Sequence, residues 1–383
     1  MRRVTMKFSI LRNEMYEALQ KVVNVIPQRS TITMTQNILF TVVGNRLELM
    51  TTDLEITMLS SVNVDVTEEG GIAVPGKLVH DIVRELPDVL LTFESDSNYR
   101  LQLRSEFGEY KIGGENPAEF PQHPQLLEAR EIVLPNEVLR RLVSHTIFAC
   151  STDELRPALT GVFFDLGAQD EGATPELRCV ATDGHRFSLM KYMDESLSGE
   201  PLQAIISTRA LNFVLRNIES EGVTAIQLGD KHAMFHMDHT RLYARLIEDV
   251  YVDYHRVIPQ DTNYEMVVDN DVLLASVRRV SLFANPISAQ VILQIQKDKV
   301  RVHAEDVDYG GEASEELPCD FTGENFTIGF NSKYLQDVLR HVDSPQAMLK
   351  FVRPDYAVIV QPTEQEEKFD QLMLVMPIRL ENE

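Results

Sequence analysis

The chain has 383 residues, which is more than one ordinary hydrophobic core holds and predicts two or three domains of about 100 to 200 residues each. Apolar residues make up 44% and charged residues 25%, so the composition indicates a globular protein and excludes an intrinsically disordered chain. The formal net charge of -23 excludes a protein that binds nucleic acid by coating itself in positive charge. Any DNA function must therefore use a segregated basic face.

The N-terminal residues and the cysteines indicate the compartment. The basic start is followed by polar residues and not by an unbroken apolar segment, so we expect no secretory signal. No run approaches the roughly 18 apolar residues of a membrane span, so we expect no membrane association. Cys150, Cys179 and Cys319 lie far apart without a C-x-x-C pair, which favours reduced, structural thiols in the cytoplasm.

Six segments along the chain read as a strand, a polar turn and then a helix of about three turns. Between them lie short alternating strands separated by turn residues, as in hairpins. The predicted helices are amphipathic. In the third, Val138, Leu139, Leu142 and Val143 fall at helical spacing and the two neighbouring arginines fall on the other face. The six segments span residues 8–19, 71–86, 131–142, 204–218, 265–277 and 327–342.

Internal repeats decide the predicted architecture. Three markers recur in the same order with a period of about 130 residues. The first marker is the asparagine that opens one helix of each repeat: Asn13, Asn136 and Asn270. The second is the aspartate of a strand-turn segment: Asp53, Asp183 and Asp306. The third is the cation that opens the other helix: Lys77, Arg209 and Lys333. The sequence therefore predicts three domains of one ancestry, at residues 1–128, 129–259 and 260–383.

Each repeat contains two strand-rich half-units with one helix apiece. Six such half-units are suited to joining edge to edge into a continuous curved sheet with the helices on one side. Closing the curve would remove the exposed sheet edges. The predicted fold class is α+β, with antiparallel sheets outside and helices inside.

Cations gather on the predicted helices although the chain is acidic. They either cover solvated helix faces and complement helix C-termini, or converge on one basic surface if all the helices line the concave side. The sequence leaves both readings open. These cations are Lys77, Arg84, Arg140, Arg141, Arg209, Arg216, Arg278, Arg279, Lys333 and Arg340.

The segment ATDGHR at residues 181–186 places Asp183, His185 and Arg186 behind a strand. A hydrolase centred on Asp183 and His185 would need an activated nucleophile, and no G-x-S-x-G elbow activates the nearby Ser188. His232 and His236 would share one face of a strand while His239 falls on the other, so their spacing does not favour a zinc site. The acidic segment 306–317 does not favour a calcium site, because the twelfth position of a calcium loop needs a glutamate and here holds a leucine. We expect a binding site without catalytic residues, metal or cofactor.

Taken together, the threefold unit, ATDGHR, YVDYHRVIP at residues 251–259 and LVMPIRL at residues 374–380 resemble the bacterial beta sliding clamp family of DNA polymerase III. The resemblance runs in order from Met6 to Leu380. It implies a non-enzymatic processivity factor, a head-to-tail homodimer whose six domains form a ring with helices around duplex DNA. The implied partners are the replicative DNA polymerase alpha subunit, the clamp loader and other clamp-motif repair and replication proteins.

The resemblance also implies functional residues. A pocket for partner peptides would use Leu159, Thr182, Gly184, His185, Arg186, Phe187, Arg256, Val257, Asn331, Tyr334, Met376, Pro377, Ile378 and Arg379. Candidate DNA contacts, from the resemblance and the helix cations, are Arg29, Lys77, Arg84, Arg140, Arg141, Arg209, Arg278 and Arg279. The dimer interface would use Tyr110 and Ile112 against Leu282 and Phe283.

The chain departs from the family pattern at several positions. Pro157 and Ala158 stand where some relatives carry aromatic residues that contact DNA, and Val252 replaces a common proline beside the pocket. Phe187 and Ile378 differ from frequent Leu and Met, which keeps the groove apolar and is expected to tune partner preference. Two other functions stay open, a peptide-binding scaffold that does not encircle DNA and the hydrolase.

Overall fold

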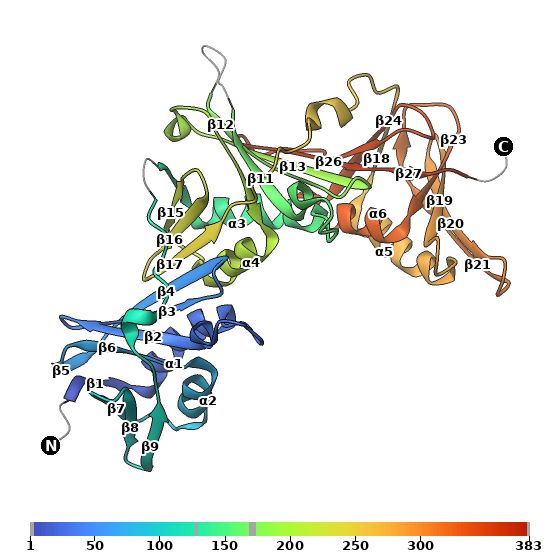
Figure 1. Cartoon of the computed structure of the whole chain (residues 1–383). Helices are drawn as coiled ribbons and strands as arrows, with labels where there is room; N and C mark the ends of the chain where they lie inside the picture. Colours follow the sequence, from blue (N-terminus) through green and yellow to red (C-terminus); the bar gives the residue numbers. More distant parts are fainter. Residues whose placement is uncertain (1–3, 127–128, 168–173, 381–383) are drawn as a thin grey trace. The chain divides into compact units, whose positions relative to one another are not determined.

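The structure is a computed structural model that describes residues 4–126, 129–167 and 174–380. The chain forms two compact units (Figure 1). Unit 1 comprises residues 1–139 and 209–246, and unit 2 comprises residues 140–208 and 247–383. The predicted second repeat is thus shared between the units, and the predicted domain boundaries stay a prediction.

The described residues contain six α-helices, one for each predicted half-unit. They are α1 (Arg12–Val22), α2 (Gly76–Glu85), α3 (Asn136–Ser144), α4 (Thr208–Asn217), α5 (Asn270–Val280) and α6 (Ser332–Leu339). The predicted apolar face of α3 is buried. No helix in the described parts of the chain is long and apolar enough to cross a membrane.

Unit 1 contains two antiparallel sheets. The five-stranded sheet has the order β5-β1-β7-β8-β9, with β1 (Val4–Leu11), β5 (Asp65–Glu68), β7 (Leu90–Asp96), β8 (Arg100–Ser105) and β9 (Gly108–Gly113). The eight-stranded sheet has the order β10-β15-β16-β17-β4-β3-β2-β6, with β2 (Asn37–Val43), β3 (Arg46–Thr52), β4 (Ile56–Asn63), β6 (Gly70–Pro75), β10 (Arg130–Pro135), β15 (Val223–Leu228), β16 (His232–Met237) and β17 (Thr240–Arg245).

Unit 2 repeats this plan. The nine-stranded sheet has the order β14-β11-β12-β13-β26-β25-β24-β18-β22, with β11 (Gly161–Leu166), β12 (Glu176–Thr182), β13 (Arg186–Met193), β14 (Leu202–Ser207), β18 (Tyr264–Asp269), β22 (Asp320–Phe321), β24 (Gln346–Phe351), β25 (Val358–Pro362) and β26 (Phe369–Val375). The five-stranded sheet has the order β21-β20-β19-β23-β27, with β19 (Gln290–Gln296), β20 (Lys299–Asp306), β21 (Gly311–Pro318), β23 (Phe326–Asn331) and β27 (Pro377–Ile378).

Two strand pairs join neighbouring repeats. In unit 1, β4 of the first repeat pairs with β17 of the second, and we call this pair with its surroundings the first joint. In unit 2, β13 of the second repeat pairs with β26 of the third, which we call the second joint. Both pairs are antiparallel, so the prediction that half-units join edge to edge is confirmed for these two pairs.

The repeated asparagine fixes a helix start to a distant segment in the second and third repeats. Asn136 is 6% exposed, and its amide donates to the carbonyl of Glu221 at 2.7 Å. Asn270 is equally buried and donates to the carbonyl of Leu339 at 3.0 Å. A buried amide must find such partners, which explains why this residue type recurs at the position.

Candidate functional site

The aspartate of ATDGHR shapes a hairpin turn. One carboxylate oxygen of Asp183, Oδ1, accepts the backbone N–H groups of His185 at 2.8 Å and Arg186 at 2.9 Å. Gly184 between them has φ +91°, a left-handed conformation that favours glycine. Thr182 closes the turn by donating its hydroxyl to the carbonyl of Arg186 at 2.7 Å. The turn therefore holds two of the predicted docking side chains in fixed places.

The equivalent aspartates of the other repeats do the same work. Asp53 accepts the N–H of Ile56 at 2.8 Å, and Asp306 accepts the N–H of Asp308 at 3.0 Å. Short polar side chains commonly bond their own backbone two or three residues on. These contacts support the interpretation that Asp183 belongs to the architecture shared by the three repeats.

Arg186 links the second repeat to the third. Its Nε lies 3.2 Å from Asp183, and its Nη1 forms an ion pair with Asp337 of α6. Its guanidinium carbon lies 5.6 Å from the ring centroid of Phe148 and 5.2 Å from that of Tyr334. The side chain is only 14% exposed. Two carboxylates and two rings therefore hold this arginine, so its contacts stabilise the arrangement of the second and third repeats at this place.

His185 and Tyr334 form an aromatic contact within the second joint, in which His185 is exposed and Tyr334 is half-buried. Their rings stack with centroids 5.3 Å apart and planes 10° apart. The carbonyl of His185 accepts the N–H of Met376 at 2.8 Å, which ties the turn to the chain after β26. The structure thus brings together His185, Arg186, Tyr334 and Met376 from three separate stretches of sequence.

A buried apolar cluster underlies the turn. Phe187 is 2% exposed and belongs to a cluster with Phe163, Tyr254 and Leu374. Tyr254 opens the short 3-10 helix Tyr254–Val257, and its hydroxyl donates to the buried Asp165 at 2.9 Å. Burial and the nearby carboxylate raise the pKa of Tyr254 to about 12, so the phenol stays protonated and can donate.

The remaining predicted docking residues differ in exposure. Leu159 is buried, and Thr182, Asn331, Pro377 and Ile378 are half-buried. Gly184, Arg256, Val257, Met376 and Arg379 are exposed. Asn331 caps α6 by accepting the N–H of Lys333 at 3.0 Å, so its side chain has a structural task. We use the term candidate docking site for the fourteen predicted residues.

The turn lacks the arrangement that hydrolysis requires. Ser188 is fully buried, and its hydroxyl donates to the carbonyl of His145 at 2.5 Å. His185 contacts Asp183 through its backbone, and its ring stacks on Tyr334. A nucleophile needs a base within hydrogen-bonding reach, and Ser188 is committed elsewhere. The geometry supports binding by an aromatic and apolar surface.

Metal and thiol chemistry is also tested by the geometry. Within residues 4–126, 129–167 and 174–380, no group of three or more His, Cys, Asp or Glu residues could hold a metal ion. All three cysteines are buried. Burial raises the pKa of Cys150 to about 12 and, with Asp320 and Asp298 nearby, that of Cys319 to about 11, so these thiols stay protonated at neutral pH.

Comparison with known proteins decides the family. Models of the N-terminal, central and C-terminal domains of the DNA polymerase III beta subunit match residues 6–124, 133–253 and 255–379. The chain belongs to the DNA polymerase III beta subunit family. The beta sliding clamp of Caulobacter vibrioides is 32% identical over 98% of this chain and 100% of its own length. That of Pseudomonas aeruginosa is 28% identical over the same shares.

Solved structures of the family share the fold. A sliding clamp from Pseudomonas aeruginosa bound to griselimycin superposes with a TM-score of 0.92 at 27% identity, covering 98% of this chain and 100% of that one. The Caulobacter crescentus beta sliding clamp gives 0.91 at 29% identity with the same coverage. The chain is therefore a DNA sliding clamp built from three clamp domains and not an enzyme, and the scaffold and hydrolase alternatives are not favoured.

The predicted DNA contacts of this clamp lie in different surroundings. Arg29, Lys77 and Arg278 are exposed. Arg84 pairs with Asp81 and Glu85, Arg209 pairs with Asp53, and Arg279 pairs with Glu315. Arg140 is half-buried. Exposed ion pairs are weak and exchange readily for a phosphate, so these seven stay predicted DNA contacts.

Two predicted residues lie in less exposed surroundings. Arg141 is held by Asp343 and Glu366 and is only 19% exposed, and it stays a predicted DNA contact. The side chain of Ile112 is 4% exposed and packs into the core, and its place in the dimer interface stays a prediction. Neighbouring Tyr110 is half-buried, whereas Leu282 and Phe283 are 82% and 46% exposed.

Sequence reasoning missed several residues that build the site. Asp337 holds Arg186, Phe148 lies beside its guanidinium, and Tyr254 anchors the short helix that carries Arg256. Asp337 lies three positions after Tyr334 on α6, a spacing that places both on one helix face and could have indicated it. Phe148 carries no comparable local signal.

Proposed function

We propose that two copies of the chain close head to tail into a ring around duplex DNA and hold partner proteins at the candidate docking site. One observation supports the ring above the others. In each joint, a strand of one kind (β4 or β13) pairs with a strand of a second kind (β17 or β26). The third copy of the first kind is β21 and that of the second kind is β9, and each lies at the end of a five-stranded sheet. Equivalent edges in two copies have the means to pair in the same way.

The register of the two joints predicts the register between copies. Ile56, the first residue of β4, pairs with Ala244, and Arg186, the first residue of β13, pairs with Val375. The first residue of β21 is Gly311, and it lies opposite the turn aspartate of its hairpin. Ile56 and Arg186 lie opposite the turn aspartates of their own hairpins, so Gly311 is the equivalent residue in the third repeat.

The matching residue of β9 is Ile112. Ile112 is buried, as are Ala244 and Val375. Each of these three residues also lies three positions before a residue that pairs with the strand leading into the second helix of its own repeat. Repeating the register places Gly311 opposite the partner's Ile112. Glu312 then lies opposite the partner's Lys111, an opposite-charge pair that favours this register.

An engineered disulfide tests the ring and its register. The register places Ser314 opposite the partner's Glu109, and both positions are exposed in the chain. We expect Ser314→Cys with Glu109→Cys to give a covalent dimer under mild oxidation, seen on a non-reducing gel. The matched control, Ser314→Cys with Tyr110→Cys, shifts the register by one residue and points one thiol to the other face. Equal cross-linking of the two variants, or none in the first, would contradict the proposed interface.

Enclosure of DNA is tested by topology. Binding that rests on phosphate contacts falls steeply with salt, whereas a closed ring cannot leave a circle at any salt concentration. We expect rings loaded on nicked circular DNA to stay bound in high salt and to be lost after linearisation. Equal loss from circular and linear DNA would contradict enclosure and favour the scaffold that does not encircle DNA.

The candidate docking site is proposed to bind peptide segments of the replicative polymerase alpha subunit, the clamp loader and other clamp-motif proteins. Support comes from the stacked pair of His185 and Tyr334, the apolar floor around Phe187 and the exposed Met376. A flexible thioether beside aromatic rings suits short apolar anchors. We also propose that the chain acts in the cytoplasm, as three domains with the predicted boundaries.

Peptide binding is measured with a fluorescein-labelled synthetic peptide carrying adjacent Leu and Phe anchors. We expect Tyr334→Ala to weaken its affinity at least about tenfold, since an aromatic contact in a binding centre contributes strongly. The matched control is Lys333→Ala, which changes the neighbouring exposed residue of α6. Unchanged affinity in Tyr334→Ala would contradict the assignment.

A further inference from the structure

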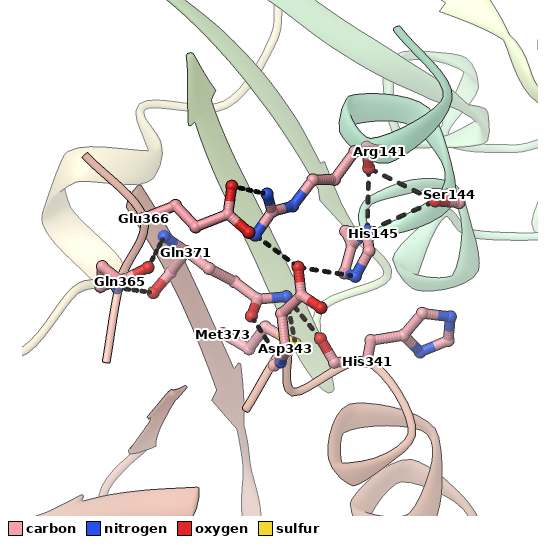
Figure 2. A network of polar contacts seen from close by, with 9 residues as sticks. All are labelled: Arg141, Ser144, His145, His341, Asp343, Gln365, Glu366, Gln371 and Met373. Carbon is pink, nitrogen blue, oxygen red and sulfur yellow. Dashed lines mark hydrogen bonds and ion pairs between the residues drawn. The ribbon is translucent and has the colours of Figure 1, made fainter. Parts of the chain in front are cut away.

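Arg141 closes the second joint beneath the candidate docking site. Its Nη2 lies 2.5 Å from Asp343 Oδ2 and its Nη1 lies 2.6 Å from Glu366 Oε2. Its guanidinium carbon lies 4.1 Å from the ring centroid of Phe369. Figure 2 shows the arginine reaching from α3 to both carboxylates. One side chain of the second repeat is thus held by three of the third.

The carboxylates that hold Arg141 are themselves fixed. Gln371 is 1% exposed; it donates to the carbonyl of His341 at 2.5 Å and accepts the N–H of Asp343 at 3.3 Å. Gln365, beside Glu366, bonds the backbone of Gln371 through both its amide oxygen and its amide nitrogen (Figure 2). These bonds favour one arrangement of the network, although Nε of Arg141 is buried without a hydrogen-bond partner and Glu366 is 67% exposed.

The same network continues toward the docking residues. The Nε2 of His145 lies 3.8 Å from Asp343, and its ring meets the ring of His341 edge to face at 6.0 Å. His341 stacks on Phe148 with ring centroids 3.9 Å apart, and Phe148 lies beside the guanidinium of Arg186. Contacts therefore run without a gap from Arg141 to the frame of the docking turn.

The first joint shows what the chain does without this arginine. In the repeat alignment on the helix-opening asparagines, Ala18 of α1 takes the place of Arg141. There a cleft of about 300 Å³ lies between α1 and β4, lined by residues that include Ala18, Lys21, Ser61 and His239. The long side chain at the second joint, by contrast, meets acidic partners and an aromatic ring.

We propose that Arg141 is a positioning residue of the docking site: by holding Asp343 and Glu366 it sets α6 and β26 against the Asp183 turn, so that Tyr334 and Met376 meet His185 in the geometry that binds a partner peptide. This inference rests on the proposed docking function. It also replaces the prediction that Arg141 contacts DNA. Arginine suits the task because its planar fork engages two carboxylates while it stacks on a ring.

The main test measures affinity for the labelled Leu-Phe peptide by fluorescence anisotropy, well below the melting temperature. We expect Arg141→Gln to weaken binding about tenfold and Arg141→Lys to weaken it less, because lysine keeps the charge and loses the fork. Glu366→Gln changes an exposed hairpin residue that folding tolerates, and we expect about threefold weaker binding. The double variant, Arg141→Gln with Glu366→Gln, should bind the peptide only slightly more weakly than Arg141→Gln alone, since both substitutions remove the same ion pair.

Lys191→Gln is the matched control. Lys191 pairs with Asp370 at 2.9 Å across the same joint and has no ion pair with Asp343 or Glu366; Asp370 itself accepts the side-chain amide of Gln365 at 3.2 Å. We expect it to bind the peptide with wild-type affinity. Wild-type affinity in Arg141→Gln as well would overturn the inference, and so would multiplicative losses in the double variant. Failure of the wild-type chain itself to bind the peptide would instead count against the proposed docking function.

A second measurement separates positioning from DNA contact. Removing one phosphate contact lowers the salt dependence of binding to a short duplex by about one ion. We expect Arg84→Gln to show that change and Arg141→Gln to keep the wild-type slope. A reduced slope with unchanged peptide affinity in Arg141→Gln would overturn the inference and restore the DNA role.

Discussion

The first and second joints use the same backbone plan and different side chains. In each, an edge strand that follows an aspartate turn pairs with the last long strand of the next repeat. At the first residue of that edge strand, the first joint has the apolar Ile56 and the second has the ion-paired Arg186. Beside the strands, the first joint has an open cleft between α1 and β4, and the second has the Arg141 network. Backbone pairing defines a joint, and side chains make the two joints differ in charge and shape.

The difference also concerns where charge is buried. Arg209 and Asp53 pair in the first joint with 48% of the arginine side chain exposed, whereas Arg186 in the second is 14% exposed. A half-exposed pair contributes little stability, while a desolvated arginine between two acids is costly to disrupt. We therefore expect the second joint to depend on its charges more than the first does.

The largest expected effect compares these two arginines. Arg186→Gln removes the cation that Asp183 and Asp337 share and leaves only Asp337 paired, with Arg340 at 2.7 Å, so we expect it to lower the free energy of unfolding by about 2 kcal/mol. Arg209→Gln should cost less than about 1 kcal/mol. Urea denaturation of both variants measures the difference. Equal losses would show that the two joints depend on charge alike.

The next effect concerns the turns of the two joints. Gly184 has φ +91° and Leu54, its counterpart in the first joint, has φ +79°. We expect Gly184→Ala to lower the free energy of unfolding by about 1 kcal/mol through backbone strain. A steric clash adds nothing to this loss, since an added Cβ meets no atom closer than 3.5 Å. Leu54→Gly relieves the same strain and should raise stability by up to about 1 kcal/mol. A loss of stability in Leu54→Gly would contradict the comparison.

Acid sensitivity is expected at the second joint. Burial lowers the pKa of His341 from its ordinary value, and His145 and Arg340 act in the same direction while Asp337 opposes them. The unfolded chain therefore binds this proton more readily than the folded chain, so stability is lost as pH falls below about 6.5. The corresponding residue of the first joint, Asn217, does not titrate.

Unfolding free energies at two pH values, one on each side of 6.5, measure this effect. We expect His341→Gln to lose less stability than the wild type between them. A pH dependence identical in the two proteins would show that His341 contributes nothing to it.

The smallest effects are expected from exposed pairs on the two joints. Arg245 pairs with Glu55 in the first joint, and Lys191 pairs with Asp370 in the second. We expect Arg245→Gln and Lys191→Gln each to change the free energy of unfolding by less than about 0.5 kcal/mol, since side-chain ordering and solvent screening offset exposed pairs. A loss above 1 kcal/mol in Lys191→Gln would show that the second joint depends on its outer charges as well.

Local pattern in the sequence was enough to predict much of this molecule. The recurrence of Asn136 and Asn270, of the turn aspartates and of amphipathic helices such as α3 predicted the repeats, six helices and edge-to-edge sheets. Each of these features rests on residues a few positions apart, because helical period, strand alternation and turn bonding are short-range properties. The Asp183 turn itself was found in this way, whereas its predicted docking role came from the family resemblance.

Which charges meet was decided by the tertiary structure alone. Arg141 looked like any basic residue on a helix, and only the pairing of β13 with β26 brings it to Asp343 and Glu366, about two hundred positions further along the chain. The same pairing brings Arg186 to Asp337 and His185 to Tyr334. A side chain's partners in a folded protein depend on long-range register, because a shift of one residue turns every side chain to the other face. The sequence by itself therefore determined the repeated units, and the strand register between them determined which side chains meet at the candidate docking site.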